Sequence, residues 1–286
     1  MSKRRRIPIL LLAGFLIGAA TLWFFQDRMI YHPKGYRPEV LRYVNQQGAR
    51  RVEVTTTQGK QTAFYRSPRE HGNEKPDFVW FILPGRASLA LDFWGHTGRW
   101  DGRFAYVFVD YPGYGLCEGK PNADHISESL AAVAEQVRRN LGWNENDLRK
   151  RSGVLGHSLG CAAALVLADH LKLKQAILCA PFTSLEDMAR RSVGWPLCCL
   201  VGNQFDNAGR LNSLTASGAR VWVFHGTDDH TIPFEMSKTL ETRFPSVVHL
   251  TLVPGCGHGA LVAQVEKEIG RQMLELAGFA ATPYPK

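Results

Sequence analysis

The chain of 286 residues is 45% hydrophobic and 21% charged, which is typical of a folded globular protein and excludes a disordered or fibrous one. Its net charge of +8 would suit nucleic acid, but the sequence has neither zinc-ligand spacing nor interleaved basic and aromatic residues. We therefore predict no nucleic-acid partner. The six cysteines are too scattered for a disulfide scaffold and form no metal-binding pattern, so we predict no metal and no cofactor.

The N-terminus combines four basic residues at positions 3–6 with an uncharged run over residues 7–25. At ~1.5 Å per residue such a run crosses a hydrocarbon layer of roughly 30 Å. We predict a single-pass membrane anchor over residues 1–30, with the rest of the chain on the extracytoplasmic side because basic residues precede the span. The alternative is a signal peptide cleaved at residues 18–20, although the apolar run continues past that site.

Strand patterns begin after residue 49. Residues 50–67 alternate polar with β-branched and aromatic residues around Gln58-Gly59, which predicts a hairpin at the edge of a sheet. Short runs that are apolar on both faces follow, as in the inner strands of a parallel sheet. They cover residues 78–83, 104–110, 153–156, 175–180, 221–226 and 248–255.

Helical segments alternate with these strands. We predict helices over residues 126–141, with Gly142 as the stop, and over residues 159–171, 234–243 and 261–276. This alternation indicates the α/β class, with a mostly parallel doubly wound sheet and helices on both faces. No repeat or linker divides the chain, so we predict one domain over residues 31–277 and a tail over residues 278–286.

The sequence "VLGHSLGCAAALVLA" places Ser158 between a buried strand and a helix. Gly156 and Gly160 remove side chains where the backbone turns sharply, and small residues let the helix pack close behind it. Such a turn presents the serine above the carboxyl edge of the sheet, where ligands bind in these folds. Ser158 is our candidate nucleophile.

A serine nucleophile needs a base and an acid that orients the base. The run "VFHGTDDHTIP" ends a strand with Asp228 and Asp229, and "VPGCGHGAL" ends the next strand with His258. The order Ser, Asp, His, with acid and base on loops after later strands, is the order that this architecture requires. His258 is therefore the candidate base, and either Asp228 or Asp229 the acid, with Asp110 a distant rival.

These motifs resemble those of the α/β-hydrolases over nearly the whole chain after residue 30. "GHSLG" is similar to the family's nucleophile elbow, "GCGHG" to its histidine loop, and "DYPGYG" to its turn after an earlier strand. "HGTDDHTIP" is similar to its acid loop, and the resemblance implies that Asp229 rather than Asp228 is the acid. "IYHPKGYRP" and "APFTSLEDMARRS" resemble the single-pass membrane subgroup, which implies cleavage of lipid esters or acyl thioesters.

The loop "LPGRAS" departs from the family, which usually has His-Gly where this chain has Pro84-Gly85. The oxyanion hole uses backbone N–H groups, so we predict that Arg86 and Leu159 donate them. The departure affects how the loop is positioned rather than which donors it offers. We also hypothesise that the Arg86 side chain reaches an anionic part of the substrate.

Residues 183–212 are too long for a simple connection and carry several large apolar side chains. They predict either a small lid over the site or a completion of the core. Asp206-Asn207 is typical of a helix cap. We expect His157, His225 and His230 to be structural.

The sequence thus predicts a membrane-anchored serine hydrolase with Ser158, His258 and Asp229 as its triad. Its expected substrates are small-molecule or lipid-like esters or thioesters. Two alternatives remain: a serine peptidase with the same machinery, and an inactive membrane-tethered binding protein. The fold alone does not identify the substrate.

Overall fold

A computed structural model describes residues 3–70, 75–202 and 205–280, and in the first helix it describes side chains from Gly14 onward except Leu22. Its centre is one eight-stranded sheet in the order β1-β2-β4-β3-β5-β6-β7-β8. The strands are β1 (Arg50–Thr56), β2 (Gly59–Arg66), β3 (Phe78–Leu83), β4 (Phe104–Val109), β5 (Ser152–His157), β6 (Gln175–Cys179), β7 (Arg220–Gly226) and β8 (Val248–Val253).

The pairing of the strands confirms the predicted mostly parallel sheet. All neighbours from β4 through β8 run parallel, whereas β1, β2 and β4 pair antiparallel. Strands β1 and β2 form the expected edge hairpin, and Gly59 at its turn has φ +91°. Every residue of β3 and of β4 is buried, which explains their continuous apolar sequence.

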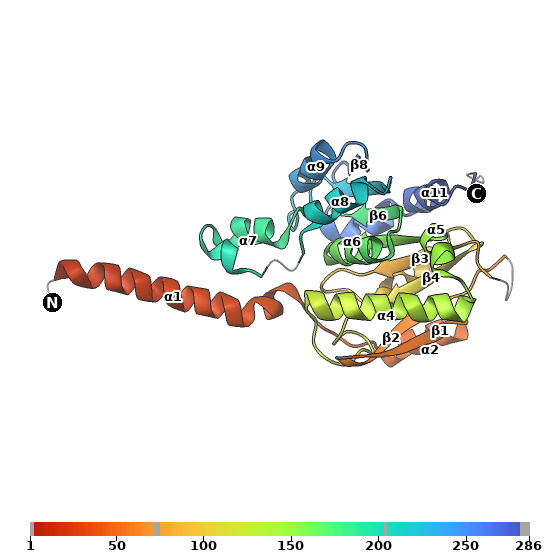
Figure 1. The fold of residues 1–286 in the computed structure, drawn as a ribbon, viewed down its shortest axis with the longest axis horizontal. Helices are drawn as coiled ribbons and strands as arrows, with labels where there is room; N and C mark the ends of the chain where they lie inside the picture. The colour runs from red at the N-terminus through yellow and green to blue at the C-terminus, as the bar shows by residue number, and fades with distance from the viewer. Residues whose placement is uncertain (1–2, 71–74, 203–204, 281–286) are drawn as a thin grey trace.

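Helices cover both faces of the sheet (Figure 1). Alternate residues of β3 enter two different hydrophobic clusters, as the alternation of side chains along a strand requires. The helices are α1 (Lys3–Ile30), α2 (Pro38–Gln46), α3 (Trp94–Thr97), α4 (Ala123–Leu141), α5 (Glu145–Lys150), α6 (Leu159–Leu171), α7 (Leu185–Val193), α8 (Asn207–Thr215), α9 (Phe234–Arg243), α10 (Leu261–Gln264) and α11 (Glu266–Leu276), with 3₁₀ turns η1 (Ala90–Phe93), η2 (Leu197–Leu200) and η3 (His258–Ala260).

Two predicted helices differ from those observed. Helix α4 begins three residues early, because the side chain of Asn122 accepts the N–H of His125 at 2.8 Å and caps the helix there. The single helix predicted over residues 261–276 is divided at Val265 into α10 and α11. The predicted stop at Gly142 is confirmed, with a left-handed φ of 61°.

The segment over residues 183–212 has two parts that differ in burial. Residues 203–204, between them, lie outside the described residues. Helix α7 has no buried residue, and Trp195 beyond it is 80% exposed. In contrast, Phe205 and Leu211 are fully buried in the core. The part with α7 therefore lies on the surface of the domain, and the part from Phe205 onward belongs to its core. The predicted cap is confirmed, because the Asp206 side chain accepts the N–H of Gly209 at 2.9 Å.

Helix α1 extends away from the domain on the side where α7 lies (Figure 1). Among the described residues, no helix has an apolar stretch long enough to cross a membrane. The structure does not describe the side chains of residues 3–13. These residues include the basic cluster at positions 3–6 and the first part of the predicted span, residues 7–13.

Candidate active site

Ser158 occupies the turn between β5 and α6. Its backbone has φ 57° and ψ −121°, a conformation that residues with a Cβ rarely adopt. A Cβ at Gly156 would overlap the carbonyl oxygen of Gly160, and one at Gly160 would overlap that of Leu83. The turn therefore requires both glycines, and it fixes Ser158 at the carboxyl edge of the sheet.

The loops after β7 and β8 bring Asp229 and His258 together. These strands are parallel neighbours, so their carboxyl ends lie at the same edge. The Nδ1–H of His258 donates to Oδ2 of Asp229 at 2.6 Å. This contact fixes the ring of His258 and leaves Nε2 as the nitrogen that can accept a proton.

Asp229 is only 6% exposed, and its second oxygen accepts the N–H groups of Thr231 and Ile232, each at 2.8 Å. Burial alone would raise the pKa of Asp229. Hydrogen bonds from His225 and His258, and from the N–H of Ile232, outweigh burial and hold the pKa of Asp229 well below its usual range. The carboxylate therefore stays ionised beside His258.

Asp228 has a different environment from its neighbour. It is exposed, and its carboxylate accepts from the hydroxyl of Thr227 at 3.3 Å. Asp229, not Asp228, contacts His258. The structure therefore places the acid expected from the family resemblance next to the candidate base.

Asp110, the distant rival, is also fully buried but belongs to another network. It accepts the hydroxyl of Tyr36 at 2.5 Å and the N–H of Ala90 at 2.8 Å. Burial raises the pKa of Asp110 to about 7. These contacts join Asp110 to the chain before and after β3, and none of them involves a histidine.

His157 lies next to Ser158 in the chain and next to His258 in space. Its Nε2–H donates to the carbonyl oxygen of His258 at 3.1 Å, and the two rings are 4.9 Å apart. Burial and the neighbouring His258 lower the pKa of His157 to about 4. His157 thus stays neutral and supports the His258 loop, a contact that the sequence pattern did not reveal.

Among the described residues, neither His225 nor His230 lines the cavity with Ser158. His225 is fully buried, with Nδ1 at 2.6 Å from the hydroxyl of Ser237 and Nε2 at 2.9 Å from the carbonyl of Ile232. These bonds shape the loop that carries Asp229. His230 is exposed.

Both candidate oxyanion donors line one cavity together with Ser158. Leu159 is the first residue of α6, so its N–H has no acceptor within the helix. Gly85 packs against the serine, because a Cβ there would lie 3.3 Å from the Cβ of Ser158. Because Arg86 follows Gly85 in the chain, its backbone is held beside the turn that carries Ser158.

Two tyrosines hold the unusual Pro84-Gly85 loop in place. The hydroxyl of Tyr111 donates to the carbonyl of Pro84, and that of Tyr114 to the carbonyl of Arg86, each at 2.7 Å. Both come from the "DYPGYG" turn, which the sequence identified as a family motif without showing its partner. The turn that follows β4 therefore supplies the support for this loop, which the sequence had left open.

The Arg86 side chain donates from Nη1 to the carbonyl of Met29 at 3.0 Å. Its guanidinium is thus bonded to the end of α1 rather than placed free for an anionic substrate. The hypothesis that this side chain selects acidic substrates stays untested.

The cavity above Ser158 has a volume of about 310 Å³. Its inner wall is formed by the turn after β5 and the loop after β7, and its outer wall by α1, α7 and Val201. The residues that line it are mostly apolar: Gln26, Met29, Ile30, Arg86, Ser158, Leu159, Phe182, Leu185, Met188, Ala189, Ser192, Val193, Val201, Thr231 and Ile232.

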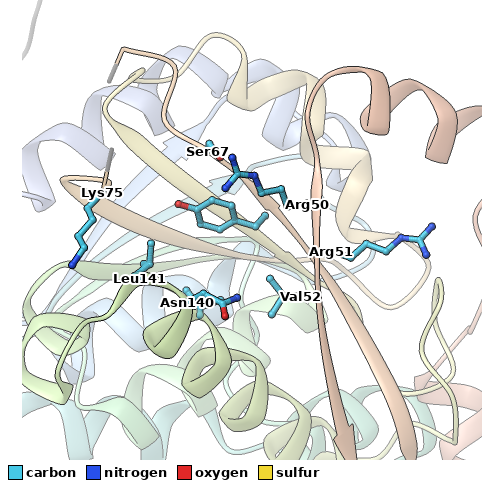
Figure 2. Close-up of a pocket in the computed structure, with 9 residues that line it drawn as sticks. Arg50, Arg51, Val52, Ser67, Lys75, Asn140 and Leu141 are labelled. Atoms are coloured by element: carbon cyan, nitrogen blue, oxygen red, sulfur yellow. The ribbon is translucent and has the colours of Figure 1, made fainter. Parts of the chain in front are cut away.

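A second cavity, of about 360 Å³, lies between the β1–β2 hairpin and the end of α4 (Figure 2). Arg50, Arg51 and Lys75 line it together with polar side chains such as Asn140. Ser158 does not line this cavity, and the residues that do line it pair no candidate nucleophile with a candidate base. We therefore place the candidate active site in the apolar cavity.

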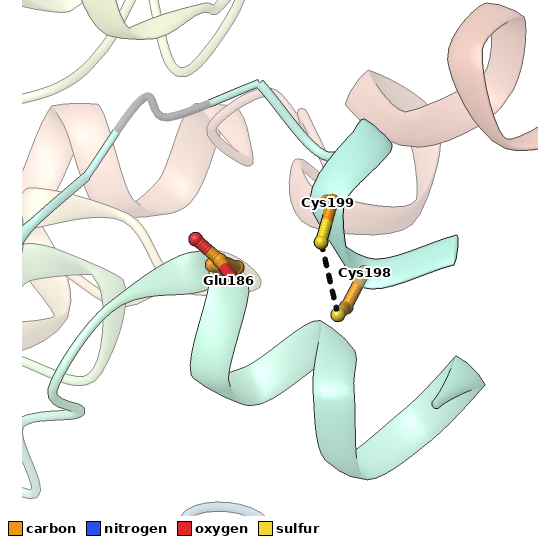
Figure 3. A group of neighbouring side chains, drawn as sticks. All are labelled: Glu186, Cys198 and Cys199. Carbon is orange, nitrogen blue, oxygen red and sulfur yellow. Dashed lines mark hydrogen bonds between the residues drawn. The ribbon is translucent and has the colours of Figure 1, made fainter. Parts of the chain in front are cut away.

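In the described part of the chain, one group of side chains has the spacing of a metal site, which the cysteine pattern had not predicted. Glu186, Cys198 and Cys199 bring their ligand atoms within 4.8 Å of one another, and the two sulfur atoms are 3.9 Å apart (Figure 3). Arg190 donates to the carboxylate of Glu186 at 2.8 Å. The negative charge that a cation would need is thus already paired.

Comparison with protein families identifies the fold. The alpha/beta hydrolase family model matches residues 71–213, which is half of the chain. The chain belongs to the alpha/beta hydrolase family. An uncharacterised protein of Mycobacterium tuberculosis is 27% identical over 268 residues, covering 90% of both chains. Alpha/beta hydrolase domain-containing protein 17C of Homo sapiens is 26% identical over 149 residues, covering 52% of this chain and 42% of its own.

Solved structures show the same alpha/beta hydrolase fold. An alpha-beta hydrolase from Vibrio vulnificus has a TM-score of 0.66 at 16% identity, with 91% of this chain and 93% of the other covered. An esterase from Pyrococcus furiosus has a TM-score of 0.63 at 17% identity, with 87% and 99% covered. The predicted alpha/beta hydrolase fold is therefore confirmed.

Proposed function

We propose that the protein is a serine hydrolase that cleaves carboxylic esters or thioesters of acyl chains. The observation that carries this proposal is Ser158 on a strained turn, at the base of an apolar cavity, at the same sheet edge as the His258–Asp229 pair. Esterase structures of the same fold agree with it. The apolar lining favours an acyl chain over a peptide.

In the proposed reaction, Nε2 of His258 takes the hydroxyl proton of Ser158 as the serine oxygen attacks the substrate carbonyl. The N–H groups of Arg86 and Leu159 hold the oxyanion. The protonated His258 then gives its proton to the leaving alcohol or thiol. Water, activated by the same histidine, releases the acid from the acyl-enzyme, while Asp229 stabilises the imidazolium.

The experiment is labelling with a fluorophosphonate, which reacts with activated serines, together with hydrolysis of p-nitrophenyl esters of increasing chain length. We expect the parent protein to be labelled and Ser158→Ala to be unlabelled, with kcat lower by about 10⁴-fold or more. Asp228→Asn is the matched control and should be labelled like the parent. A folded but unlabelled parent would instead indicate a binding protein.

We propose in addition that residues 1–30 anchor the protein in a membrane, with the domain on the extracytoplasmic side. Large apolar side chains on the described half of α1 support this, because Ile17, Trp23 and Phe24 are each more than half exposed. After cell fractionation we expect the protein in the membrane pellet after a carbonate wash. A C-terminal alkaline phosphatase fusion should be active only if the domain is exported.

A further inference from the structure

The last turn of α1 is part of the cavity that contains Ser158. Gln26, Met29 and Ile30 line this cavity opposite Leu185 and Met188 of α7. The sequence had assigned residues 1–30 to an anchor separate from the catalytic domain. The cavity crosses that boundary, because one of its walls comes from the end of the predicted anchor.

Hydrogen bonds fix this end of α1 relative to the oxyanion loop. Arg86 donates from its side chain to the carbonyl of Met29 at 3.0 Å. Two residues after α1 ends, the N–H of His32 lies 3.2 Å from the carbonyl of Arg86 and 2.8 Å from the hydroxyl of Tyr114. The wall and the candidate oxyanion donor are therefore held together, and α1 does not join the domain as a free tether.

Gln26 joins the end of α1 to Gly202, in the segment that follows η2. Its side chain is 9% exposed, and its Oε1 accepts the N–H of Gly202 at 3.1 Å. Its Nε2 donates to the carbonyl of Trp23 at 3.2 Å. Because both polar atoms of Gln26 bond to backbone, the wall offers a substrate mainly apolar surface.

The mainly apolar lining of the cavity suits an uncharged chain. Among the described residues that line it, Arg86 is the one charged side chain, and its guanidinium is bonded to Met29. The side chains of Met29, Ile30, Leu185 and Met188 are apolar, and the two methionines are flexible enough to follow a hydrocarbon chain.

We propose that the last turn of α1 selects the acyl chain, with Met29 and Ile30 as specificity-determining residues that contact the hydrocarbon of the substrate. This inference rests on the proposed function, since it names a second role for α1 at that same site. A larger residue at position 29 shortens the space for the chain, and a smaller one extends it.

The test compares Met29→Trp and Met29→Ala in the full chain, using p-nitrophenyl acetate, butyrate, octanoate and dodecanoate. The quantity measured is the ratio of kcat/KM for the long esters to that for acetate. We expect Met29→Trp to lower this ratio by about tenfold and Met29→Ala to raise it several-fold, because each methylene in an apolar pocket contributes roughly a tenfold or larger preference. Opposite shifts cannot come from a general loss of folding.

Phe24→Ala is the control variant. Phe24 lies on the same helix and is 79% exposed, but it does not line the cavity that contains Ser158. Its ratio should equal that of the parent. If the Met29 variants keep the parental ratio while Ser158 is labelled by the fluorophosphonate, this inference is wrong and the proposed function stands. If the parent itself is not labelled, the proposed function fails first.

Discussion

The two walls of the cavity are built in different ways. The inner wall is formed by loops at the carboxyl edge of the sheet, and hydrogen bonds fix the polar groups of these loops and of the neighbouring loop after β8. Asp229 and His258 belong to this network without lining the cavity themselves. The outer wall, formed by α1 and α7, consists mainly of apolar side chains, and α7 has no buried residue. Figure 1 shows both helices at the margin of the domain, away from the sheet.

This difference matches two different physical demands. Proton transfer and attack on a carbonyl need groups placed within a fraction of an ångström, which only an interlocked network provides. Contact with a hydrocarbon chain is non-directional and tolerates changes in shape. We therefore expect substitutions in the inner wall to affect the rate of chemistry, and those in the outer wall to affect the choice of substrate.

The largest effect is expected at Asp229. Asp229→Asn should lower kcat by about 10⁴-fold, because the amide no longer stabilises the imidazolium or fixes the ring of His258. Asp228→Asn, one residue away but exposed, should stay within about twofold of the parent. Equal losses in the two variants, measured with p-nitrophenyl butyrate, would contradict the assignment of the acid.

The same substitution should change how stability depends on pH. The folded pKa of Asp229 lies below its unfolded value of about 3.9, so its carboxylate stabilises the folded state above that pH. This contribution decreases progressively as the pH falls from the unfolded pKa toward the folded pKa, so part of it is already lost at pH 3. Urea unfolding at pH 3 and pH 7 should show a smaller difference in the free energy of unfolding for Asp229→Asn than for the parent.

An intermediate effect is expected at His157, which supports the inner wall without joining the chemistry. His157→Ala removes the bond to the carbonyl of His258 and should lower kcat about tenfold. His157→Gln keeps an amide donor and should recover most of that loss. The pKa of His157 is about 4, so its removal should leave the pH profile above pH 5 unchanged. A shifted profile would show that His157 itself titrates in the reaction.

A smaller effect on stability tests whether the inner wall is strained. Ser158 has φ 57°, which is costly for a residue with a Cβ. Ser158→Gly should therefore have a free energy of unfolding about 1 kcal/mol above that of Ser158→Ala, while both variants should lack activity. Urea denaturation of the two variants gives the comparison. Equal stabilities would mean that the turn stores no strain.

The smallest effect is expected in the outer wall. Met188 of α7 lines the cavity and is only partly buried, where it packs against the margin of the core. Met188→Ala should lower the free energy of unfolding by no more than about 1 kcal/mol. A loss of 2 kcal/mol or more by urea denaturation would show that α7 is part of the folding core, and the contrast between the two walls would no longer hold.

Much of the inner wall could be predicted from the sequence, because each part has a local pattern. The strands are continuous apolar runs, and Ser158, Asp229 and His258 each follow one of them in the chain. The two glycines that the turn at Ser158 requires are also visible in the sequence on either side of it. These features depend on residues that are neighbours in the sequence, and the structure places them as local rules require.

The rest depends on contacts between segments that are distant in the sequence. The bonds from Tyr111 and Tyr114 to the loop at Pro84 and Arg86 span 27 and 28 residues, and the bond from Arg86 to Met29 spans 57. No periodicity or motif spacing indicates such pairs. The division of the last helix at Val265 has the same character, since no proline or glycine marks it in the sequence.

The direction in which α1 leaves the domain has a practical consequence. Its last turn borders the cavity, and the rest of the helix extends away from the domain on the side where α7 lies (Figure 1). A bulky label attached to the last turn of α1 would therefore sit beside the cavity that contains Ser158.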